Sequence, residues 1–363
     1  MFKGIDLYSD TVTKPTIEMR KAIVMAEVGD EQRAEDPTTR QLEEMMAGLL
    51  GFSAAIFLPS ATMANEIAIR SLCDAGDELI AAENCHLFFA EAGGPAIYGG
   101  VMCKPVPTLT GIFSAEEVRQ RYQWIKGPHF STTKLVSVEN TTNMGGGIPW
   151  EQEELRQIVN VADELGLKKH MDGARFFNAS VKTGLTPSEI AAGFDMVTIC
   201  LSKGLGCPLG AVLAFDKVYY DKVRRLKQLM GGAMRQSGMM AAAGIYALNH
   251  HITRLAEDHR NAEFLADRLQ EVPQLRLLNY PPATNMVFFE WISNAMTPAE
   301  FNECCLQKGF RLSQVGPRKF RAVTHLDITR SDLEKVAALI AEIGTDAGIA
   351  GCKASTAISG NNN

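Results

Sequence analysis

The sequence predicts an α/β protein with a mostly parallel sheet in a large domain, followed by a smaller α+β domain. Short apolar runs alternate with helical patterns through the first two thirds of the chain, which is typical of βαβ units. From about Asn249 onward, this alternation gives way to long helices separated by single strands. The 363 residues are 46% hydrophobic and 21% charged, so the chain is long and apolar enough to bury a sizeable core.

Six apolar runs are expected to form the strands of the large domain. They cover 54–58, 77–81, 134–139, 168–172, 195–201 and 211–215. Between the strands, the helical pattern of 38–51 places five apolar side chains on one face: Leu42, Met45, Met46, Leu49 and Leu50. We expect this stripe to face the core.

The second domain is predicted from a different pattern. Helices are expected over 255–270, 297–309 and 331–344, with strands over 284–291 and 320–325. The expected boundaries are 1–248 for the large domain, to which the N-terminal segment adds a contact with the small domain, and 249–345 for the small domain. Residues 346–363 lack periodicity and are rich in small and polar residues, which predicts a disordered tail.

Charge and cysteine usage narrow the function class. A net charge of −6 gives no general attraction to nucleic acid or to anionic membranes, so a small-molecule substrate is expected. No secretory signal pattern and no membrane-length apolar run is present, which predicts a cytoplasmic protein. The eight cysteines are scattered without a CxxC spacing, so we expect no metal site, no disulfide framework and reduced, mostly buried thiols.

Lys203 and Asp172 together point to a cofactor. Each lies at or just past the end of an apolar, strand-like run, in the segments SKGLG and HMDGAR. A lysine amine can form a Schiff base with the aldehyde of pyridoxal 5'-phosphate (PLP), and an aspartate can hold the pyridine nitrogen protonated so that the ring accepts electrons. The pair predicts PLP chemistry.

Three further segments carry a resemblance. DLYSDTVTKP near the N-terminus, LPSATMAN after a predicted strand and GGAMRQSG beyond the lysine occur in an order that resembles the threonine aldolase family. This family belongs to the aspartate-aminotransferase-like (fold type I) PLP enzymes, and the resemblance extends from about Asp6 to about Leu339. It implies the fold type I architecture, PLP as the cofactor and an amino acid as the substrate.

The resemblance assigns residues to the cofactor. Ala61 and Thr62 would bind the phosphate with their backbone N–H groups, at a helix start that favours anions; the family usually has glycine at the position of Ala61. His86 would stack on the ring near the substrate hydroxyl and assist proton transfer. Ser202 is grouped with these residues because it precedes Lys203.

Arg235 in GGAMRQSG matches an arginine that, in this family, reaches the phosphate of a neighbouring subunit. The resemblance therefore implies a homo-oligomer, dimer or tetramer, with shared active sites. A family lysine seven residues before this arginine is replaced by Gln228, with Lys227 beside it.

The substrate carboxylate would be bound by Arg175, Ser9 and Arg321, again by resemblance. A planar guanidinium can form two parallel hydrogen bonds to a carboxylate and so fix the orientation of the α-carbon. That orientation selects which bond to the α-carbon breaks.

The sequence departs from the family near the substrate side chain. Thr142 replaces a family histidine that contacts the β-hydroxyl of threonine, and Arg33 and Ala34 replace the common tyrosine and glycine. A threonine hydroxyl cannot serve as a general base at neutral pH. We expect Arg33 and Thr142 to lie close to the substrate side chain.

Two reactions remain open at this point. In the first, His86 or a water molecule takes the hydroxyl proton, and the enzyme cleaves an L-β-hydroxy amino acid to glycine and an aldehyde. In the second, Lys203 acts as a base on the Cα–H bond, giving an amino acid racemase or a β-eliminating lyase. A non-enzymatic binding module is a third reading, but such a module has no need of the Schiff-base lysine.

Overall fold

The computed structural model describes residues 2–345 and 347–348. Contacts divide the chain into two compact units: a larger unit formed by Lys14–Thr253, and a smaller unit formed by the residues up to Thr13 together with those from Arg254 onward. The predicted tail over 346–363 lies outside the described residues, apart from 347 and 348. None of the described helices has the length and apolar character needed to cross a membrane.

The larger unit is built around a seven-stranded sheet with the order β2-β8-β7-β6-β5-β3-β4. Only β8 runs antiparallel to its neighbours. The strands are β2 (Ala54–Leu58), β3 (Glu78–Ala82), β4 (Met102–Val106), β5 (Thr133–Glu139), β6 (Lys168–Gly173), β7 (Met196–Cys200) and β8 (Ala211–Phe215). All six predicted strands of this domain are confirmed, and β4 was missed. The α/β class and the mostly parallel sheet are likewise confirmed.

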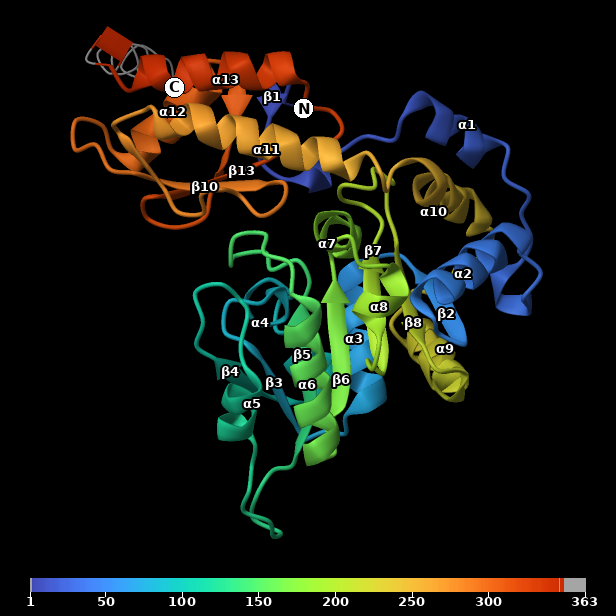
Figure 1. Cartoon of the computed structure of the whole chain (residues 1–363). Helices are drawn as coiled ribbons and strands as arrows, with labels where there is room; N and C mark the ends of the chain where they lie inside the picture. The colour runs from blue at the N-terminus through green and yellow to red at the C-terminus, as the bar shows by residue number, and fades with distance from the viewer. Residues whose placement is uncertain (1, 346, 349–363) are drawn as a thin grey trace, which may run out of the picture. The chain divides into compact units, whose positions relative to one another are not determined.

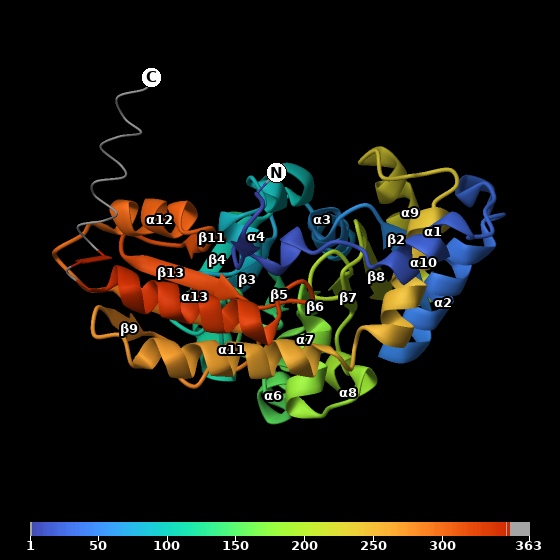
Figure 2. The ribbon, with the colours of Figure 1, turned by 90° about the horizontal axis from the view of Figure 1, so that it is seen from above.

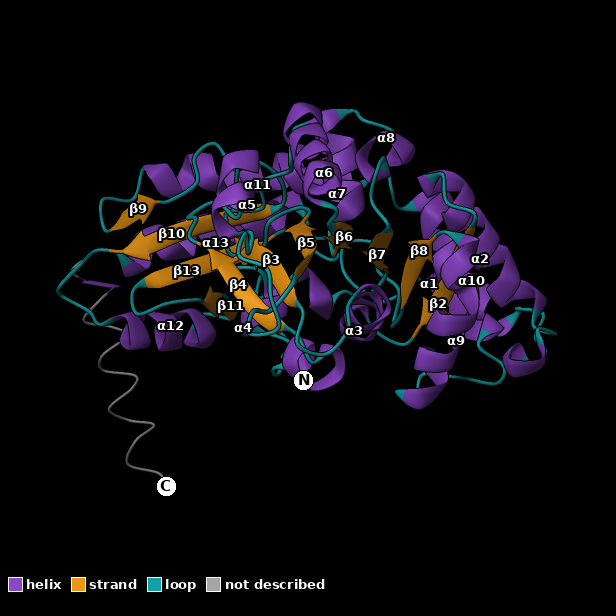
Figure 3. Ribbon diagram, turned by 90° about the horizontal axis from the view of Figure 1, so that it is seen from below, coloured by secondary structure: helices purple, strands orange, loops and turns teal. Residues whose placement is uncertain are grey.

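Helices cover both faces of this sheet (Figures 1 and 3), which is why β3, β7 and β8 are buried along their whole length. α3 lies on one face, and α5, α6 and α8 lie on the other. The helices of the larger unit are α1 (Ile17–Val24), α2 (Pro37–Leu50), α3 (Ala61–Leu72), α4 (His86–Phe89), α5 (Ala115–Arg121), α6 (Gln152–Leu165), α7 (Phe176–Thr183), α8 (Pro187–Ala191), α9 (Tyr220–Leu229) and α10 (Gly238–His250).

Local sequence explains the ends of α2. Asp36 caps its start by accepting a hydrogen bond from Thr39 N at 2.8 Å, and Pro37 occupies the first turn, where no N–H is needed. Gly51 ends the helix at φ 78°, a left-handed conformation that favours glycine. Of the predicted apolar stripe, Leu42, Met46 and Leu50 are buried, Met45 is partly buried and Leu49 is exposed.

The smaller unit contains a four-stranded antiparallel sheet with the order β12-β13-β10-β9 and a short parallel pair, β1-β11. Its strands are β1 (Ile5–Asp6), β9 (Leu275–Leu277), β10 (Met286–Trp291), β11 (Phe310–Arg311), β12 (Ser313–Gln314) and β13 (Lys319–Val323). α11 (Leu255–Gln270) and α13 (Arg330–Ile343) lie side by side, with α12 (Pro298–Gln307) beyond them (Figure 2). The predicted helices and strands of this region are confirmed.

The cysteines follow the expectation only in part. Cys73, Cys85, Cys200, Cys207 and Cys305 are free and buried, whereas Cys103 is free but exposed. Cys304 is disulfide-bonded, so the expectation that every thiol is reduced was wrong at this residue.

Candidate active site at the carboxyl ends of the parallel strands

Several of the predicted site residues lie at or follow the carboxyl ends of strands in the larger unit. Ala61 follows β2, His86 follows β3, Thr142 follows β5, Asp172 lies near the end of β6 and Lys203 follows β7. Because the carboxyl ends of parallel strands meet at one edge of a sheet, these residues share that edge, where the arrow of β6 ends in Figure 1.

Asp172 is a buried carboxylate held from two sides. Its Oδ1 accepts a hydrogen bond from Ala174 N at 3.0 Å, and its Oδ2 accepts one from Asn65 Nδ2 at 3.0 Å. Asn65 comes from α3, so the carboxylate is fixed by both its own strand and the neighbouring helix. A fixed, buried carboxylate can pair with a protonated ring nitrogen.

His86 begins α4 and pairs with a buried carboxylate. Its Nδ1 lies 2.8 Å from Glu91 Oε1, and its side chain is 32% exposed, whereas that of Glu91 is fully buried. The hydrogen bond to Glu91 raises the pKa of His86 above its usual value; burial opposes this, Asp172 adds to it and the Lys203 ammonium lowers it. Nδ1 is thus committed to Glu91, which leaves Nε2 for other chemistry.

Lys203 lies in the connection between β7 and β8. The chain turns tightly here, because Gly206 N donates to Lys203 O at 2.8 Å and Leu201 N donates to Gly210 O at 2.9 Å. Ser202 precedes it, with Oγ 3.6 Å from Cys200 Sγ. The effect of its ammonium on the pKa of His86 indicates that the two side chains are electrostatic neighbours.

α3 starts with a capped, polar turn. Ser60 Oγ accepts a hydrogen bond from Met63 N at 3.2 Å, and Ala61 and Thr62 are the first two helical residues. Backbone N–H groups in a first turn have no intrahelical acceptor and point out of the helix, where they can bind an anion.

The three residues predicted to bind a carboxylate are all buried. Arg175, at the start of α7, donates from Nη1 to Asn143 Oδ1 at 3.4 Å. Ser9 and Arg321 belong to the smaller unit, where Val323 N of the strand that carries Arg321 donates to Leu7 O at 2.9 Å. That bond places the segment of Ser9 beside the strand of Arg321.

Thr142 is fully buried in the loop after β5. Its Oγ1 accepts a hydrogen bond from Ile148 N at 3.2 Å, and its backbone is bonded to Ile148 and Gly147. A Cβ at Gly145 would lie 2.8 Å from Thr142 Oγ1, so the side chain is enclosed by backbone. Contact with a substrate would require this buried side chain to become accessible, and the role of Thr142 stays a prediction.

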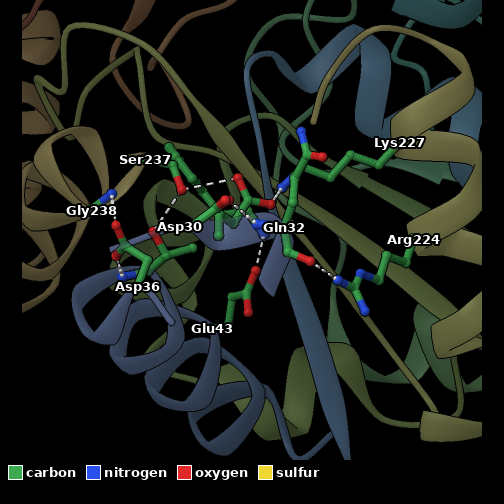
Figure 4. Close-up of polar contacts among 11 residues, drawn as sticks. Asp30, Gln32, Asp36, Glu43, Arg224, Lys227, Ser237 and Gly238 are labelled. Atoms are coloured by element: carbon green, nitrogen blue, oxygen red, sulfur yellow. Dashed lines mark hydrogen bonds and ion pairs between the residues drawn. The ribbon is translucent and has the colours of Figure 1, made fainter. Parts of the chain in front are cut away.

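A second polar region, which we call the cation-paired cluster, is drawn in part in Figure 4; Arg235 belongs to it, and Arg33 contacts one of its members, Asp30. The members of the cluster are Asp30, Glu31, Asp36, Glu43, Arg224, Lys227, Arg235 and Ser237. Arg235 Nη1 donates to Asp30 Oδ2 at 2.8 Å, with the arginine side chain 60% exposed. Arg33 Nε lies 3.8 Å from Asp30 Oδ2 and is also exposed. Both arginines are accessible in the single chain.

The buried Lys227 ammonium is paired with Glu31 in the same cluster. Ser237 Oγ donates to Glu31 Oε2 at 3.0 Å, so both oxygens of this carboxylate have donors. In the single chain, the Lys227 ammonium is therefore already engaged by Glu31.

Sequence reasoning missed four polar residues around His86 and Asp172: Asn65, Glu66, Glu91 and Glu139. Together with those two residues they form what we call the His86 network. The signal was present for Asn65 and Glu66, which interrupt an apolar stretch of α3. Glu91 gave no comparable signal, because its partners are distant in sequence.

Glu139 ties the loops together at the end of β5. Its Oε1 accepts from His86 N at 3.0 Å and its Oε2 accepts from Asn143 N at 2.7 Å. Burial, and then the charge of Asp172, raise the pKa of Glu139 to about 7, although the two backbone donors oppose the shift. One carboxyl thus fixes the positions of both the His86 and the Asn143 loops.

Comparison with known proteins identifies relatives along nearly the whole chain. The family model described as "Beta-eliminating lyase" matches residues 6–292. The low specificity L-threonine aldolase of Escherichia coli K12 is 40% identical over 92% of this chain and 97% of its own length. Low-specificity L-threonine aldolase 1 of Arabidopsis thaliana is 36% identical over 92% of this chain and 94% of its own.

Solved structures support the fold. The threonine aldolase of Leishmania major superimposes with a TM-score of 0.81 at 20% identity, covering 94% of this chain and all of that one. A structure of SPT with PLP superimposes with a TM-score of 0.72 at 19% identity, covering 95% and 88% of the two chains. The expected fold type I architecture is therefore confirmed.

Proposed function

The chain belongs to the beta-eliminating lyase family, and from this premise we propose that it is a PLP-dependent low-specificity L-threonine aldolase. The reaction is the retro-aldol cleavage of an L-β-hydroxy amino acid, threonine or allo-threonine, to glycine and an aldehyde. For threonine, the aldehyde is acetaldehyde. The similarity to threonine aldolases of bacteria and plants, over more than nine tenths of the chain, supports this choice.

The residues present fit PLP. The buried Asp172 carboxylate suits a ring nitrogen, the first turn of α3 suits a phosphate and Lys203 supplies an amine on the next strand connection. When bound, PLP supplies an electron sink for the pair of electrons left at the α-carbon. We assign Ala61, Thr62, Asp172, Ser202 and Lys203 to the cofactor.

His86 is the residue that we assign to the hydroxyl proton, and the geometry around it carries the proposal. The His86 Nδ1 is held 2.8 Å from the buried Glu91 carboxylate, while side-chain oxygens of Glu91 and Asp172 and a ring nitrogen of His86 lie within 4.8 Å of one another. A histidine whose Nδ1 hydrogen is held by a carboxylate is a stronger base at Nε2. Thr142 cannot share this role, which leaves His86 or a water molecule, and we assign the proton transfer to His86.

Binding of the substrate carboxylate is assigned to Arg175, with Ser9 and Arg321 in the same role. A guanidinium held by Asn143 is oriented before substrate arrives, which lowers the entropy cost of binding. Arg33 is proposed to lie near the substrate side chain. The assignments of Arg175, Ser9 and Arg321 rest on positions that match the family, whereas that of Arg33 rests on a position at which this sequence departs from the family.

The proposed assembly is a homo-oligomer, dimer or tetramer, in which Arg235 contacts the phosphate bound by a second subunit. Its exposure in the single chain supports the proposal. The alternative reaction, racemisation or β-elimination with Lys203 as the Cα base, is favoured by one observation. The position of the family's hydroxyl-contacting histidine holds Thr142, which is fully buried.

The test is a product assay with the purified, PLP-loaded protein. We expect acetaldehyde and glycine in equal amounts from L-threonine and L-allo-threonine, and no product when Lys203→Ala is assayed. Racemisation of L-alanine without aldehyde release from either threonine isomer would overturn the proposal and select the alternative reaction. Retention of multiple turnover by Lys203→Ala would remove this lysine from the site.

A further inference from the structure

Four buried acceptor atoms behind His86 have no hydrogen-bond donor among the described residues. They are Asn65 Oδ1, both carboxyl oxygens of Glu66, and Glu91 Oε2. A buried acceptor without a donor is costly, and a buried charge without one is more so. Three of these four atoms belong to two neighbouring carboxyl groups, those of Glu66 and Glu91, which we call the acid pair.

One proton on one of these carboxyls removes much of the cost. Two carboxylates in contact in a buried site do not both stay ionised. Burial, followed by the charge of Glu91 and a hydrogen bond to it, raises the pKa of Glu66 to about 9. A protonated Glu66 carboxyl can donate a hydrogen bond to Glu91 Oε2, which gives a partner to two of the four atoms that lack one.

The proton is assigned to Glu66 because the neighbouring hydrogen-bond donors, Asn65 and His86, both donate to Glu91. Glu91 Oε1 accepts from Asn65 Nδ2 at 2.9 Å and from His86 Nδ1 at 2.8 Å. Glu66 has no such donors. The turn that follows Glu91 packs closely on Glu66, since a Cβ at Gly94 would lie 2.0 Å from Glu66 Oε1 and Gly94 N donates to Glu91 O at 2.8 Å. Hydrogen bonds stabilise the charged form of Glu91 and leave Glu66 as the neutral member of the pair.

We propose that Glu66 is a positioning residue that holds a proton permanently and donates it to Glu91 Oε2, which fixes the Glu91 carboxylate as the acceptor for His86 Nδ1. Glu66 contacts neither substrate nor cofactor in this account. The consequence for proton transfer at His86 Nε2 rests on the proposed function, whereas the protonation of Glu66 does not.

The groups that face this pair come from several elements. Four charged groups act electrostatically on or with His86: Glu91 follows α4, Asp172 and Glu139 lie at the ends of β6 and β5, and Lys203 follows β7. Besides Glu91, Cys103 on β4 faces Glu66. Asn65 Nδ2 also donates to Asp172 Oδ2, so the same α3 segment links the acid pair to the carboxylate assigned to the cofactor.

The first test is infrared spectroscopy of the PLP-loaded, full-length protein at neutral pH. A protonated carboxylic acid gives a C=O stretching band that ionised carboxylates lack. The difference spectrum between wild type and Glu66→Gln is expected to show the loss of one such band. Absence of that band from wild type would overturn the proposal, because Glu66 would then be ionised.

The second test measures the titration of His86 by NMR of the protein labelled with ¹³C-histidine. The His86 signal is assigned by its loss in His86→Asn. Glu66→Gln keeps a donor toward Glu91, so the pKa of His86 is expected to stay at the wild-type value. Glu66→Met removes the donor at similar volume, so the less compensated Glu91 charge is expected to raise the pKa of His86 by about half a unit to one unit. The acidic limb of kcat/KM should move upward with it.

The sign of the shift separates the outcomes. If Glu66 were ionised in the wild type, both variants would lose a negative charge and lower the pKa of His86, which would contradict the proposal. Glu43→Gln, a buried carboxyl in the cation-paired cluster, is the matched control and should leave the His86 titration in place. Failure of threonine cleavage with an intact infrared band would count against the proposed function alone.

Discussion

The His86 network and the cation-paired cluster both bury carboxyl groups, and they compensate them differently. In the cation-paired cluster, part of which is drawn in Figure 4, Glu31 is paired with Lys227, and Asp30 is paired with Arg235. In the His86 network, Asp172 is held by an amide and a backbone N–H, and the acid pair by Asn65 and His86. Salt bridges to Lys227 and Arg235 hold two carboxylates of the cluster, whereas neutral donors and one inferred proton hold those of the network.

The difference follows from what each region has to do. A carboxylate paired with a protein cation is already neutralised and has little attraction left for a bound cationic group. A carboxylate held by neutral donors keeps its full charge for an imidazole or a ring nitrogen. The network thus keeps negative charge available, while the cluster uses its own for stability.

The largest expected effect is on Asp172. Replacement by alanine should lower kcat for L-threonine by about 10³-fold, because a fixed buried charge is lost at the reacting group. Steady-state kinetics with the PLP-saturated variant would measure it. Asp195→Asn, at the amino end of β7, is the control and should stay within about twofold of wild type. A near-normal rate for Asp172→Ala would remove this residue from the site.

Breaking an ion pair of the cation-paired cluster should lower the stability of the protein. Lys227→Met leaves Glu31 without its ammonium partner, and breaking one side of a buried ion pair costs about 3 kcal/mol in the free energy of unfolding. Urea denaturation would measure it, with the exposed Arg225→Met on the same helix as control. Equal stabilities of the two variants would show that the buried pair does not stabilise the cluster.

Removing a carboxylate charge from the His86 network should instead shift the pH dependence of kcat/KM. Glu91 raises the pKa of His86, so Glu91→Gln is expected to lower that pKa. Because the base form of His86 is the neutral one, the acidic limb of kcat/KM should move to lower pH. The weaker base should lower the plateau about 10- to 100-fold. The exposed Glu83→Gln is the control. An acidic limb of kcat/KM that does not move in Glu91→Gln would contradict the pairing of Glu91 with His86.

The smallest expected effect concerns Glu43, a carboxyl of the cluster that accepts a hydrogen bond from a backbone N–H group. Burial raises its pKa from 4.5 to about 7, although the hydrogen bond from Phe57 N opposes the shift. The folded state then binds more protons than the unfolded state between these values, so stability falls as pH rises through this window. Glu43→Gln should remove this loss, giving about 1–3 kcal/mol above wild type near pH 8 and little change below about pH 4.5.

Thermal and urea denaturation at the two pH values would check that prediction. Glu44→Gln, the exposed neighbour on α2, should show no such pH-dependent gain. A gain of equal size at both pH values would mean that Glu43 titrates alike in the folded and unfolded states.

The sequence was sufficient for most strands and helices because their apolar periodicity reflects burial directly. β4 was missed for a physical reason. Met102 on this edge strand is exposed and Pro105 interrupts it, so neither alternation nor an unbroken apolar run marks the strand. Leu49 shows the opposite error, since an apolar residue at the border of a helical stripe can remain exposed.

A site residue could be predicted where one short sequence motif contains both the residue and the strand end at which it lies. Asp172 and Lys203 stand at strand ends that the sequence already indicated. The acid pair could not be predicted, because Glu66 and Glu91 meet through the packing of α3 against the loop after α4. Thr142 also needed the structure, which shows its hydroxyl bonded within its own loop. We therefore expect Thr142→His to destabilise this loop rather than to restore a base.

The central claim is that His86 takes the hydroxyl proton in threonine cleavage, and one paired measurement tests it. In His86→Asn loaded with PLP, cleavage of L-threonine is compared with exchange of the glycine α-proton, which involves no hydroxyl group. The account predicts that cleavage falls at least about 100-fold, while exchange falls by less than about tenfold. Equal losses in both reactions, or cleavage at the wild-type rate, would contradict the assignment of His86 as the base.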